Sequence, residues 1–477
     1  MESPSSRGGL VLTGRAGALA AAGSVVVGLV SGLLHVTGWI GIGAFEGALA
    51  GLIAADAYMA GSPRRLQLER AGDTVVRLGQ PASVSLTVRN ADSRVVRGTL
   101  RDSWPPSAGN HSAGNQGAGD AGNAAAAALA ADGDAKQILR VGIEPRHRFT
   151  IQPGRMATVQ SLLNPTRRGD RRPDRVTLRL FGPLGLAGRQ VWCQVPWRLR
   201  VLPSFESRRH LPSRLAQLHE TDGRTPVLVR GQGSEFDSLR EYVLGDDVRS
   251  IDWRATARRN DVVVRTWRPE RDRHVVIVLD TGRTSAGRVG DVPRLDSAMD
   301  AALLLAALAT RAGDRVDLLA YDQRAQASVT GALPGRTLAT FSDAMATLEP
   351  SLIELNARGL VDHLVTRVRR RSLVVLLTSI DTAAITEGLL PLIARLTSRH
   401  KVVLASVADP RVAQLATARG DADAVFAAAS AELAISTRRK TAEELSRHGV
   451  HVVDAIPERF APALADKYLA LKASGLL

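Results

Sequence analysis

Two long apolar segments near the amino terminus constrain the fold of this 477-residue chain more than any other feature. Residues 16–35 and 39–60 each form a predominantly apolar run of about 20 residues, enough for a helix to cross the ~30 Å hydrocarbon core of a membrane. A secretory signal peptide would have one shorter apolar core with no second span behind it. Residues 1–65 are therefore predicted to form a transmembrane helical hairpin.

The basic residues around the hairpin predict its orientation. They stand before the first span and after the second, and the connection at residues 36–38 carries none. By the positive-inside rule, we expect a cell-membrane protein with two spans, both termini in the cytoplasm and a cytosolic body. The only cysteine, Cys193, is consistent with a reducing compartment. The basic residues in question are Arg7, Arg15, Arg64 and Arg65.

Small residues recur at every fourth position of both spans and so fall on one face of each helix. Such a face lets two helix backbones approach closely, which predicts packing within the hairpin, with a contact between copies as the alternative. Glu46, inside the second span, is expected to be protonated or near the interface. The small residues are Ser24, Gly28, Gly32, Gly43, Gly47 and Gly51.

The next segment, residues 66–203, has the pattern of a β-sandwich. Short runs alternate apolar and polar residues with period two, and Gly and Pro stand between them. Residues 107–134 interrupt this pattern with a Gly, Ala, Asn and Ser tract that has too little apolar bulk to fold. We therefore expect a β-sandwich with a disordered insertion.

The charge of the chain is concentrated on this sandwich. The net charge is +15, and residues 136–200 hold 14 Lys and Arg against three acids. A basic face directly below a membrane attracts anionic lipid headgroups, although it can also be only a solvated surface. Aromatic residues make up 4% of the chain, which argues against a stacking platform for nucleic acid. Membrane lipids are the expected partner of this face, and no nucleic acid is expected.

The carboxy-terminal part, residues 273–477, alternates apolar strands with amphipathic helices. Strands that are apolar on both faces need helices on both sides, so this pattern predicts a doubly wound parallel α/β sheet. Residues 204–272 are expected to link it to the sandwich. Ligands of such sheets bind at the carboxyl ends of the strands.

Acids and hydroxyls follow two of these strands. Asp280 and Thr284 come after the first strand and Asp381 after a later one, a set of oxygen ligands that would suit Mg²⁺. The sequence resembles the von Willebrand factor type A fold, whose adhesion-type metal site has an Asp-x-Ser-x-Ser motif. Gly282 stands where that motif has its first Ser, so the resemblance implies a degenerate site. The alternative is that these residues only cap loops and helix starts.

A more specific signal lies at residues 231–259, where acids and arginines alternate around one tryptophan. Such charges can pair and fix the segment, or Trp253 can anchor a partner protein. The stretch resembles the signature of the domain-of-unknown-function 58 family, which precedes a type A domain. The residues singled out are Glu235, Arg240, Tyr242, Asp246, Asp247, Arg249, Asp252, Trp253 and Arg254.

The sequence contains no Gly-x-Ser-x-Gly elbow, His-Glu-x-x-His helix, P-loop or dinucleotide-binding motif, so no catalytic role is expected. The family resemblance implies a MoxR-type AAA+ ATPase as partner. We therefore expect a membrane-anchored scaffold that binds proteins through its type A-like domain. The alternative is a basic sandwich that binds anionic lipid or nucleic acid directly. A degenerate metal-dependent hydrolase ranks behind both.

Overall fold

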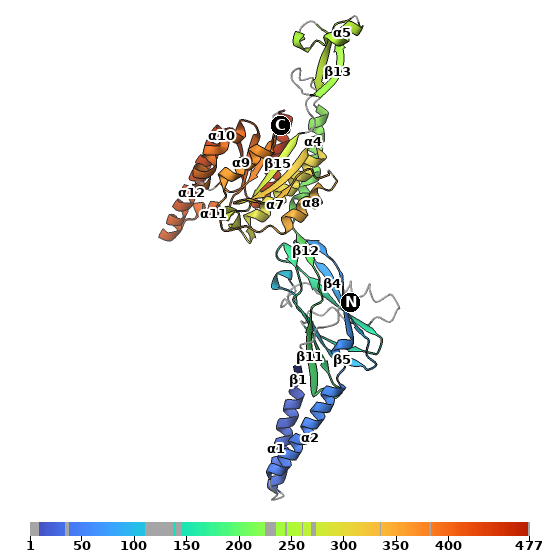
Figure 1. Ribbon diagram of the computed structural model, residues 1–477. Helices are drawn as coiled ribbons and strands as arrows, with labels where there is room; N and C mark the ends of the chain where they lie inside the picture. Colours follow the sequence, from blue (N-terminus) through green and yellow to red (C-terminus); the bar gives the residue numbers. More distant parts are fainter. Residues whose placement is uncertain are drawn as a thin grey trace. The chain divides into compact units, whose positions relative to one another are not determined.

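The computed structural model divides the chain into two compact units, residues Met1–Leu202 and Pro203–Leu477, which are described separately (Figure 1). It describes residues 9–33, 38–109, 137–139, 146–224, 235–243, 246–259, 261–268, 273–333, 335–380 and 383–475.

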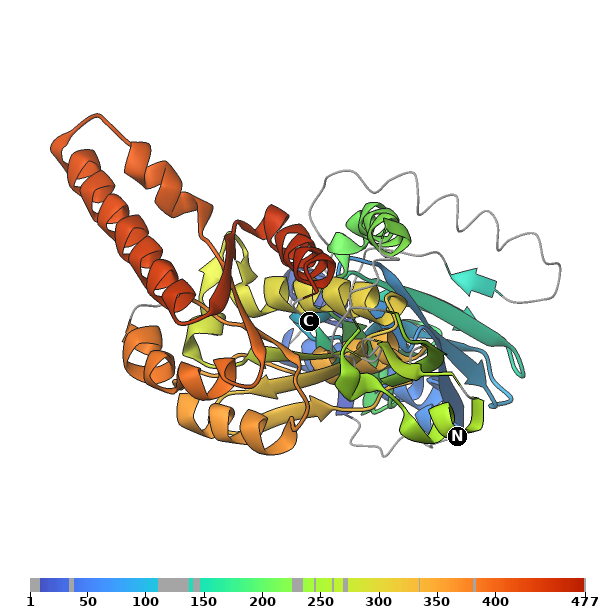
Figure 2. The same cartoon turned by 90° about the horizontal axis from the view of Figure 1, so that it is seen from above.

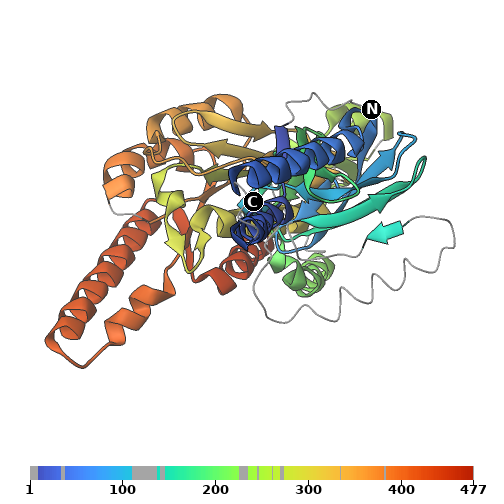
Figure 3. The same ribbon diagram turned by 90° about the horizontal axis from the view of Figure 1, so that it is seen from below.

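The first unit begins with two long helices, α1 (Gly14–Leu33) and α2 (Gly38–Met59), which lie side by side (Figure 3). Both are long and apolar enough to cross a membrane, and most of their side chains are exposed. Trp39 and Tyr58, 84% and 74% exposed, are nineteen positions apart on α2, about 28 Å along the helix. Aromatic residues favour the two interfaces of a membrane, so this spacing fits one bilayer crossing.

The close contacts between α1 and α2 do not involve the glycines that the sequence singled out. A side chain at Gly28, Gly43, Gly47 or Gly51 would meet open space. The helices instead approach each other at Gly23, against the Phe45 ring, and at Gly41, against Val27 and Ser31. The predicted packing of the small-residue face within the hairpin is therefore wrong for these four glycines. Gly32 lies in α1, and its surroundings are outside the described residues.

Two larger sheets and one smaller sheet form the β-sandwich of this unit. The alternation seen in the sequence puts Leu100 and Leu178 of one sheet against Leu86 and Val88 of the other in a single core. The strand orders are β1-β11-β10-β5-β7, β2-β4-β8-β6 and β3-β12-β9. The elements are β1 (Gly9–Leu12), η1 (Pro63–Arg65), β2 (Leu66–Gly72), β3 (Val75–Arg77), β4 (Ala82–Asn90), β5 (Val96–Asp102), η2 (Pro106–Ala108), β6 (Gln137–Leu139), β7 (His147–Ile151), β8 (Met156–Leu163), β9 (Gly169–Arg171), β10 (Val176–Phe181), β11 (Ala187–Cys193) and β12 (Leu199–Leu202).

Two predicted boundaries in this unit need correction. Strand β1 precedes the first long helix and pairs with β11, so the sandwich begins before residue 66. At the start of the predicted disordered insertion, Ala108 is buried in the core and Ser107 hydrogen-bonds through its carbonyl and its hydroxyl to Thr166 and Arg171. The rest of that insertion, residues 110–134, lies outside the described residues.

The turn between β10 and β11 joins the sandwich to both long helices. Asp56, fully buried near the end of α2, accepts hydrogen bonds from the backbone amides of Leu184, Leu186 and Ala187 at 2.7–2.9 Å. Thr13, between β1 and α1, donates its hydroxyl to the Gly185 carbonyl at 2.7 Å. The helices and the sandwich are thus fixed to each other by buried hydrogen bonds.

The second unit is built on a six-stranded sheet in the order β19-β18-β15-β20-β21-β22. Five strands are parallel, and β19 is antiparallel at the edge. Helices α4, α7, α8 and α13 cover one face, and α9, η5, α10 and part of α12 cover the other. The predicted α/β sheet with helices on both faces is confirmed, with the antiparallel edge strand as an addition.

The strands of this sheet and the short β16–β17 pair are β15 (His274–Asp280), β16 (Arg288–Val289), β17 (Val292–Pro293), β18 (Arg315–Tyr321), β19 (Ala325–Val329), β20 (Leu373–Leu377), β21 (Lys401–Val407) and β22 (Val450–Ala455). The helical elements are η3 (Glu206–His210), α4 (Leu211–Arg224), α6 (Arg283–Ala286), α7 (Arg294–Arg311), α8 (Thr337–Ala346), α9 (Ala357–Arg367), η5 (Ala384–Leu389), α10 (Leu390–Thr397), α11 (Pro410–Thr417), α12 (Ala422–Arg447) and α13 (Pro457–Ala473). Helices α11 and α12 pack together as an arm that extends from the sheet (Figure 2).

The predicted linker, residues 204–272, is divided between two structures. Helix α4 belongs to the α/β domain, because Leu218 is buried in its core and Ser207 donates to the Asp300 carboxylate at 3.0 Å. The described residues between 235 and 268 form a two-stranded hairpin of β13 (Glu235–Glu241) and β14 (Val263–Arg268), with η4 (Val248–Ser250) and α5 (Trp253–Arg259) between the strands (Figure 1).

Candidate functional site

The candidate site lies at the carboxyl ends of β15 and β20, which are neighbours in the sheet. Asp280 is the last residue of β15 and is only 3% exposed. Its Oδ1 accepts a hydrogen bond from the Gly282 amide at 2.7 Å. Its Oδ2 accepts the hydroxyls of Thr284 at 3.0 Å and Thr378 at 2.6 Å. The structure thus brings together Asp280 and Thr284, as predicted, and adds Thr378.

A second buried carboxylate directly follows the neighbouring strand β18. Asp322 accepts hydrogen bonds from the backbone amide of Arg324 and from the side chains of Gln326 and Ser351, at 2.8–3.2 Å. Asp322 is not among the residues predicted from the sequence. The signal was present, because Asp322 follows an apolar strand just as Asp280 does.

The two carboxyls differ in their tendency to ionise. Burial is the largest influence on Asp280 and raises its pKa, because its hydrogen bonds from Thr378, Gly282 and Thr284 compensate only in part. Burial also disfavours ionised Asp322, but the hydrogen bonds that it accepts, from Gln326 foremost, outweigh burial and lower its pKa. The site therefore holds one carboxyl that favours the neutral form beside one that favours the ionised form.

A cavity of about 380 Å³ opens beside Asp280. Thr284, Thr378 and Ser379 contribute hydroxyls to its lining, and η5 and its neighbours contribute mainly apolar residues together with Glu387. Element η5 is a π-helical turn just before Pro391, whose ring cannot sit against the carbonyl four residues earlier in a regular α-helix. Glu354 and Arg283, also at the cavity, form an ion pair with each other.

The described residues do not fit a bound Mg²⁺ ion. Asp280 is the one predicted carboxylate ligand among them, and both of its oxygens already accept hydrogen bonds. No group of three or more His, Cys, Asp or Glu that would hold a metal occurs in the described part of the chain. A side chain at Gly282 would come within 2.9 Å of the Ile353 carbonyl, so this backbone leaves no room for the missing serine. The predicted ligand Asp381 lies outside the described residues.

Most acids of the signature segment have a local structural role in the β13–β14 hairpin. Asp246 accepts Arg240 at 2.6 Å and the Val243 amide at 3.0 Å. Asp247 caps η4 by accepting the Arg249 amide at 3.0 Å. These contacts agree with the expectation that the charges of the segment pair with one another.

Asp252 also has a structural role, at the start of α5. It accepts the backbone amides of Arg254 and Ala255 and the Arg265 side chain, and these hydrogen bonds, from Ala255 foremost, lower its pKa. The amide of Tyr242 donates to the Val262 carbonyl across the strands at 2.8 Å. Glu235 lies in β13, and its side chain is outside the described part.

The hairpin exposes apolar side chains. Trp253 is 68% exposed, so it is not an anchor buried within this chain. We call the exposed apolar residues Val243, Val248, Trp253 and Val262 the hairpin surface. The side chains of Arg249, Arg254 and Arg258 form no ion pair with any described residue. The hairpin thus presents apolar and positively charged groups together.

The fold and the two sites describe a chain with two membrane-length helices, a β-sandwich, and an α/β domain with a polar rim and a projecting signature hairpin. Residues 238–450 match the model of the family described as "Protein of unknown function DUF58". The resemblance expected from the signature is confirmed.

Similar curated proteins include three uncharacterized proteins from Mycobacterium bovis and two strains of Mycobacterium tuberculosis. Each is 28% identical over 190 residues, which is 39% of this chain. The chain spans 59% of the length of these relatives. Among solved structures, a CARDB domain from Pyrococcus furiosus in complex with di-metal ions aligns over 31% of this chain and 92% of that one, at 10% identity. Its TM-score of 0.17 supports no assignment of fold or function.

Proposed function

We propose that this protein is a membrane-anchored adaptor that binds a partner protein on the cytoplasmic side. Helices α1 and α2 anchor it with both termini in the cytoplasm, as the flanking arginines indicate. The α/β domain is of the von Willebrand factor type A class, and the hairpin surface and the rim around Asp280 are its two contact regions. The proposal includes no catalytic step.

The hairpin surface carries the proposal. The acids Asp246 and Asp252 are engaged within the hairpin, whereas Trp253 is exposed. Trp and Arg are the residues most often found at the energetic centres of protein interfaces. A partner that fits this surface has an apolar pocket bordered by acidic residues.

The partner proposed here is a MoxR-type AAA+ ATPase, in the assembly or maturation of a complex. This choice rests on the resemblance of residues 231–259 to the DUF58 signature. The rim would add a polar contact through the hydroxyls of Thr284 and Thr378, which line the cavity beside Asp280. Any Mg²⁺ at this rim would need ligands from the partner, because the described residues of this chain supply too few.

The test is binding of the purified full chain in detergent to the MoxR-type ATPase of the same organism. We expect Trp253→Ala to weaken the affinity at least 10-fold, because truncation of a central tryptophan typically costs about 2–4 kcal/mol. The matched control is Phe426→Ala in α12, another exposed aromatic residue outside the hairpin surface. It should leave the affinity unchanged.

Equal weakening by both variants would show that the hairpin surface is not the contact. Absence of binding by the unaltered chain, with and without nucleotide, would overturn the choice of partner. Asp280→Asn separates the two regions, because loss of binding in that variant alone would place the contact at the rim.

A further inference from the structure

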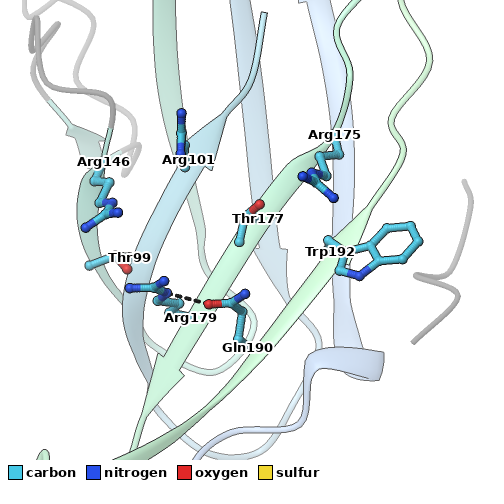
Figure 4. Close-up of a pocket in the computed structure, with 8 residues that line it drawn as sticks. All are labelled: Thr99, Arg101, Arg146, Arg175, Thr177, Arg179, Gln190 and Trp192. Carbon is cyan, nitrogen blue, oxygen red and sulfur yellow. Dashed lines mark hydrogen bonds between the residues drawn. The ribbon is translucent and has the colours of Figure 1, made fainter. Parts of the chain in front are cut away.

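The outer face of the sandwich carries a groove lined by arginines, separate from the contact regions proposed above. It has a volume of about 330 Å³ and lies over β5, β10 and β11 (Figure 4). We call it the arginine groove. Its lining residues are Thr99, Arg101, Arg146, Arg175, Thr177, Arg179, Gln190 and Trp192.

The arginine groove follows from the alternation of the strands. Leu100, Leu178 and Val191 point into the core, so the residues beside them point outward. These outward positions hold Thr, Arg, Gln and Trp, and no acid is among the lining residues. The acid Asp102, at the end of β5, faces the core and pairs there with Arg70. Four guanidinium groups are therefore gathered without a lining carboxylate.

The groups are placed to receive an anion. Arg179 donates its Nε to the Gln190 Oε1 at 2.6 Å, which fixes its plane and leaves its terminal nitrogens available. Figure 4 shows Arg146 and Arg179 on one side of Thr177 and Arg175 on the other. Arg175 makes a long, exposed contact with Asp174 at 3.5 Å. Arg101 and Arg146 pair with no residue in the described ranges.

A phosphate group fits this chemistry. The planar fork of arginine matches two oxygens of a phosphate, and the hydroxyls of Thr99 and Thr177 are additional donors. Like charges held this close repel one another, and a bound anion relieves that repulsion. One guanidinium alone would be an ordinary surface charge, but four around one cavity indicate a multiply charged ligand.

The connection to the helices indicates a lipid source for this phosphate. Ala187, the first residue of β11, is bound by Asp56 near the end of α2. Gln190 and Trp192 are three and five residues further on, about 10 and 17 Å along the strand. The headgroup region extends about 5–8 Å beyond the hydrocarbon core and an arginine side chain covers several ångström more, so Arg179, which pairs with Gln190, is the groove arginine nearest to the headgroups.

We propose that the arginine groove binds the phosphate of an anionic lipid headgroup. The inference rests on the membrane anchoring proposed above, and not on any partner protein. It goes beyond a general basic surface because it assigns the binding to particular arginines of one sheet face.

The test uses the full chain in a nonionic detergent and short-chain, water-soluble lipids. Phosphatidylglycerol is compared with phosphatidylcholine and with inorganic phosphate, and binding is followed by calorimetry. We expect phosphatidylglycerol to bind at least 10-fold more tightly than either. The double variant Arg101→Gln/Arg179→Gln should lose at least 10-fold of that affinity.

The matched control is Arg189→Gln, which removes an exposed arginine of the same strand β11 that does not line the groove. It should bind phosphatidylglycerol like the unaltered chain. Protection of the buried Cys193 thiol reports whether each variant is folded.

Equal weakening by Arg189→Gln and by the double variant would overturn the proposal in favour of general surface charge. Equal affinity for inorganic phosphate and phosphatidylglycerol would assign the groove to a soluble phosphate compound instead. Tighter binding of a short oligonucleotide than of lipid would also overturn it. None of these results bears on the hairpin surface, so the adaptor proposal is tested independently.

Discussion

Asp280 and Asp322 lie at the carboxyl ends of adjacent strands, the first as the last residue of β15 and the second directly after β18, yet their surroundings shift their pKa values in opposite directions. Asp322 accepts enough hydrogen bonds to offset its burial, whereas Asp280 does not. The donors to Asp322 include Gln326 of β19 and Ser351, whereas those to Asp280 are the Gly282 amide and the hydroxyls of Thr284 and Thr378. The chemistry of the rim is therefore set by a few amides and hydroxyls, several of them distant in sequence.

Cys193 gives the sharpest prediction at the level of one residue. Burial raises the pKa of its thiol to about 11, so the folded protein holds it protonated and unreactive near neutral pH. We expect no reaction with Ellman's reagent at pH 8 in the native chain and complete reaction of one thiol in denaturant. Because this is the only cysteine, the absorbance change reports on the sandwich alone.

The raised pKa of Cys193 also determines how the stability of the folded chain changes with pH. A thiol whose pKa is raised by folding stabilises the folded state below its unfolded pKa of 9.0, and this contribution is lost as the pH rises toward about 11. A Cys193→Ser variant should lack this part of the decline. Rapid labelling of the native chain at pH 8 would contradict the burial of Cys193.

Part of the site was predictable from single residues. Asp280 and Thr284 are four positions apart at the end of an apolar strand, and in the structure the Thr284 hydroxyl lies 3.0 Å from the Asp280 Oδ2. Thr378 was harder to assign, because its contact with Asp280 depends on the register of β15 against β20. The crowding at Gly282 depends on Ile353, a residue 71 positions away, so the missing hydroxyl could be read from the sequence but its cause could not.

Among the elements, the turn between β10 and β11 has the most consequential contacts, since Asp56 satisfies three of its amides. The Asp56→Asn variant keeps the shape of the side chain. It replaces one acceptor oxygen with an NH2 group, which then faces backbone amides that also donate. We expect a loss of about 2–4 kcal/mol in unfolding free energy, because buried backbone amides lose an acceptor. Thermal unfolding in detergent, followed by exposure of Cys193, measures it.

Glu46→Gln is the control for this prediction. It removes a carboxyl group from the same helix, but Glu46 is exposed and, among the described residues, accepts a hydrogen bond only from the Ser24 hydroxyl, at 3.3 Å. The control should change stability by less than about 0.5 kcal/mol. If both variants lowered the unfolding free energy to a similar extent, the loss would come from removing any carboxyl group of α2 and not from the hydrogen bonds between Asp56 and the turn.

Strand and helix patterns were predictable where the periodicity was strong. The five apolar runs of the carboxy-terminal half became β15, β18, β20, β21 and β22. Strand β19, with the sequence AQASV, has almost no apolar contrast and was not predicted. Strand β1 was missed because its four residues stand directly before a span and have no alternating pattern of their own. Short edge strands depend on their neighbours for definition.

For the whole molecule, the arrangement of the spans leads to a prediction of topology. Fusions of green fluorescent protein at either terminus should fluoresce, and fusions of alkaline phosphatase at the same places should be inactive, because both termini are expected in the cytoplasm. The matched control is a truncated alkaline phosphatase fusion after residue 37, which should be active. An active phosphatase at Leu477 would rule out a cytosolic partner.

The division of the chain into parts was predictable only in outline. Composition separated the apolar, alternating and α/β regions correctly. It did not show that β1 belongs to the sandwich or that α4 belongs to the α/β domain, because both depend on contacts with residues far away in sequence. The register of β1 against β11 spans some 180 residues, and no local pattern encodes such a pairing.

A single residue, Thr13, separates β1 from α1, and Asp56 holds the far end of α2 to the same turn. The sandwich is therefore held to both helices by direct contacts and not by a long flexible linker. In the membrane-anchored arrangement proposed above, any tilt or rotation of the helical pair is passed to the sandwich, which keeps the same side toward the lipid surface.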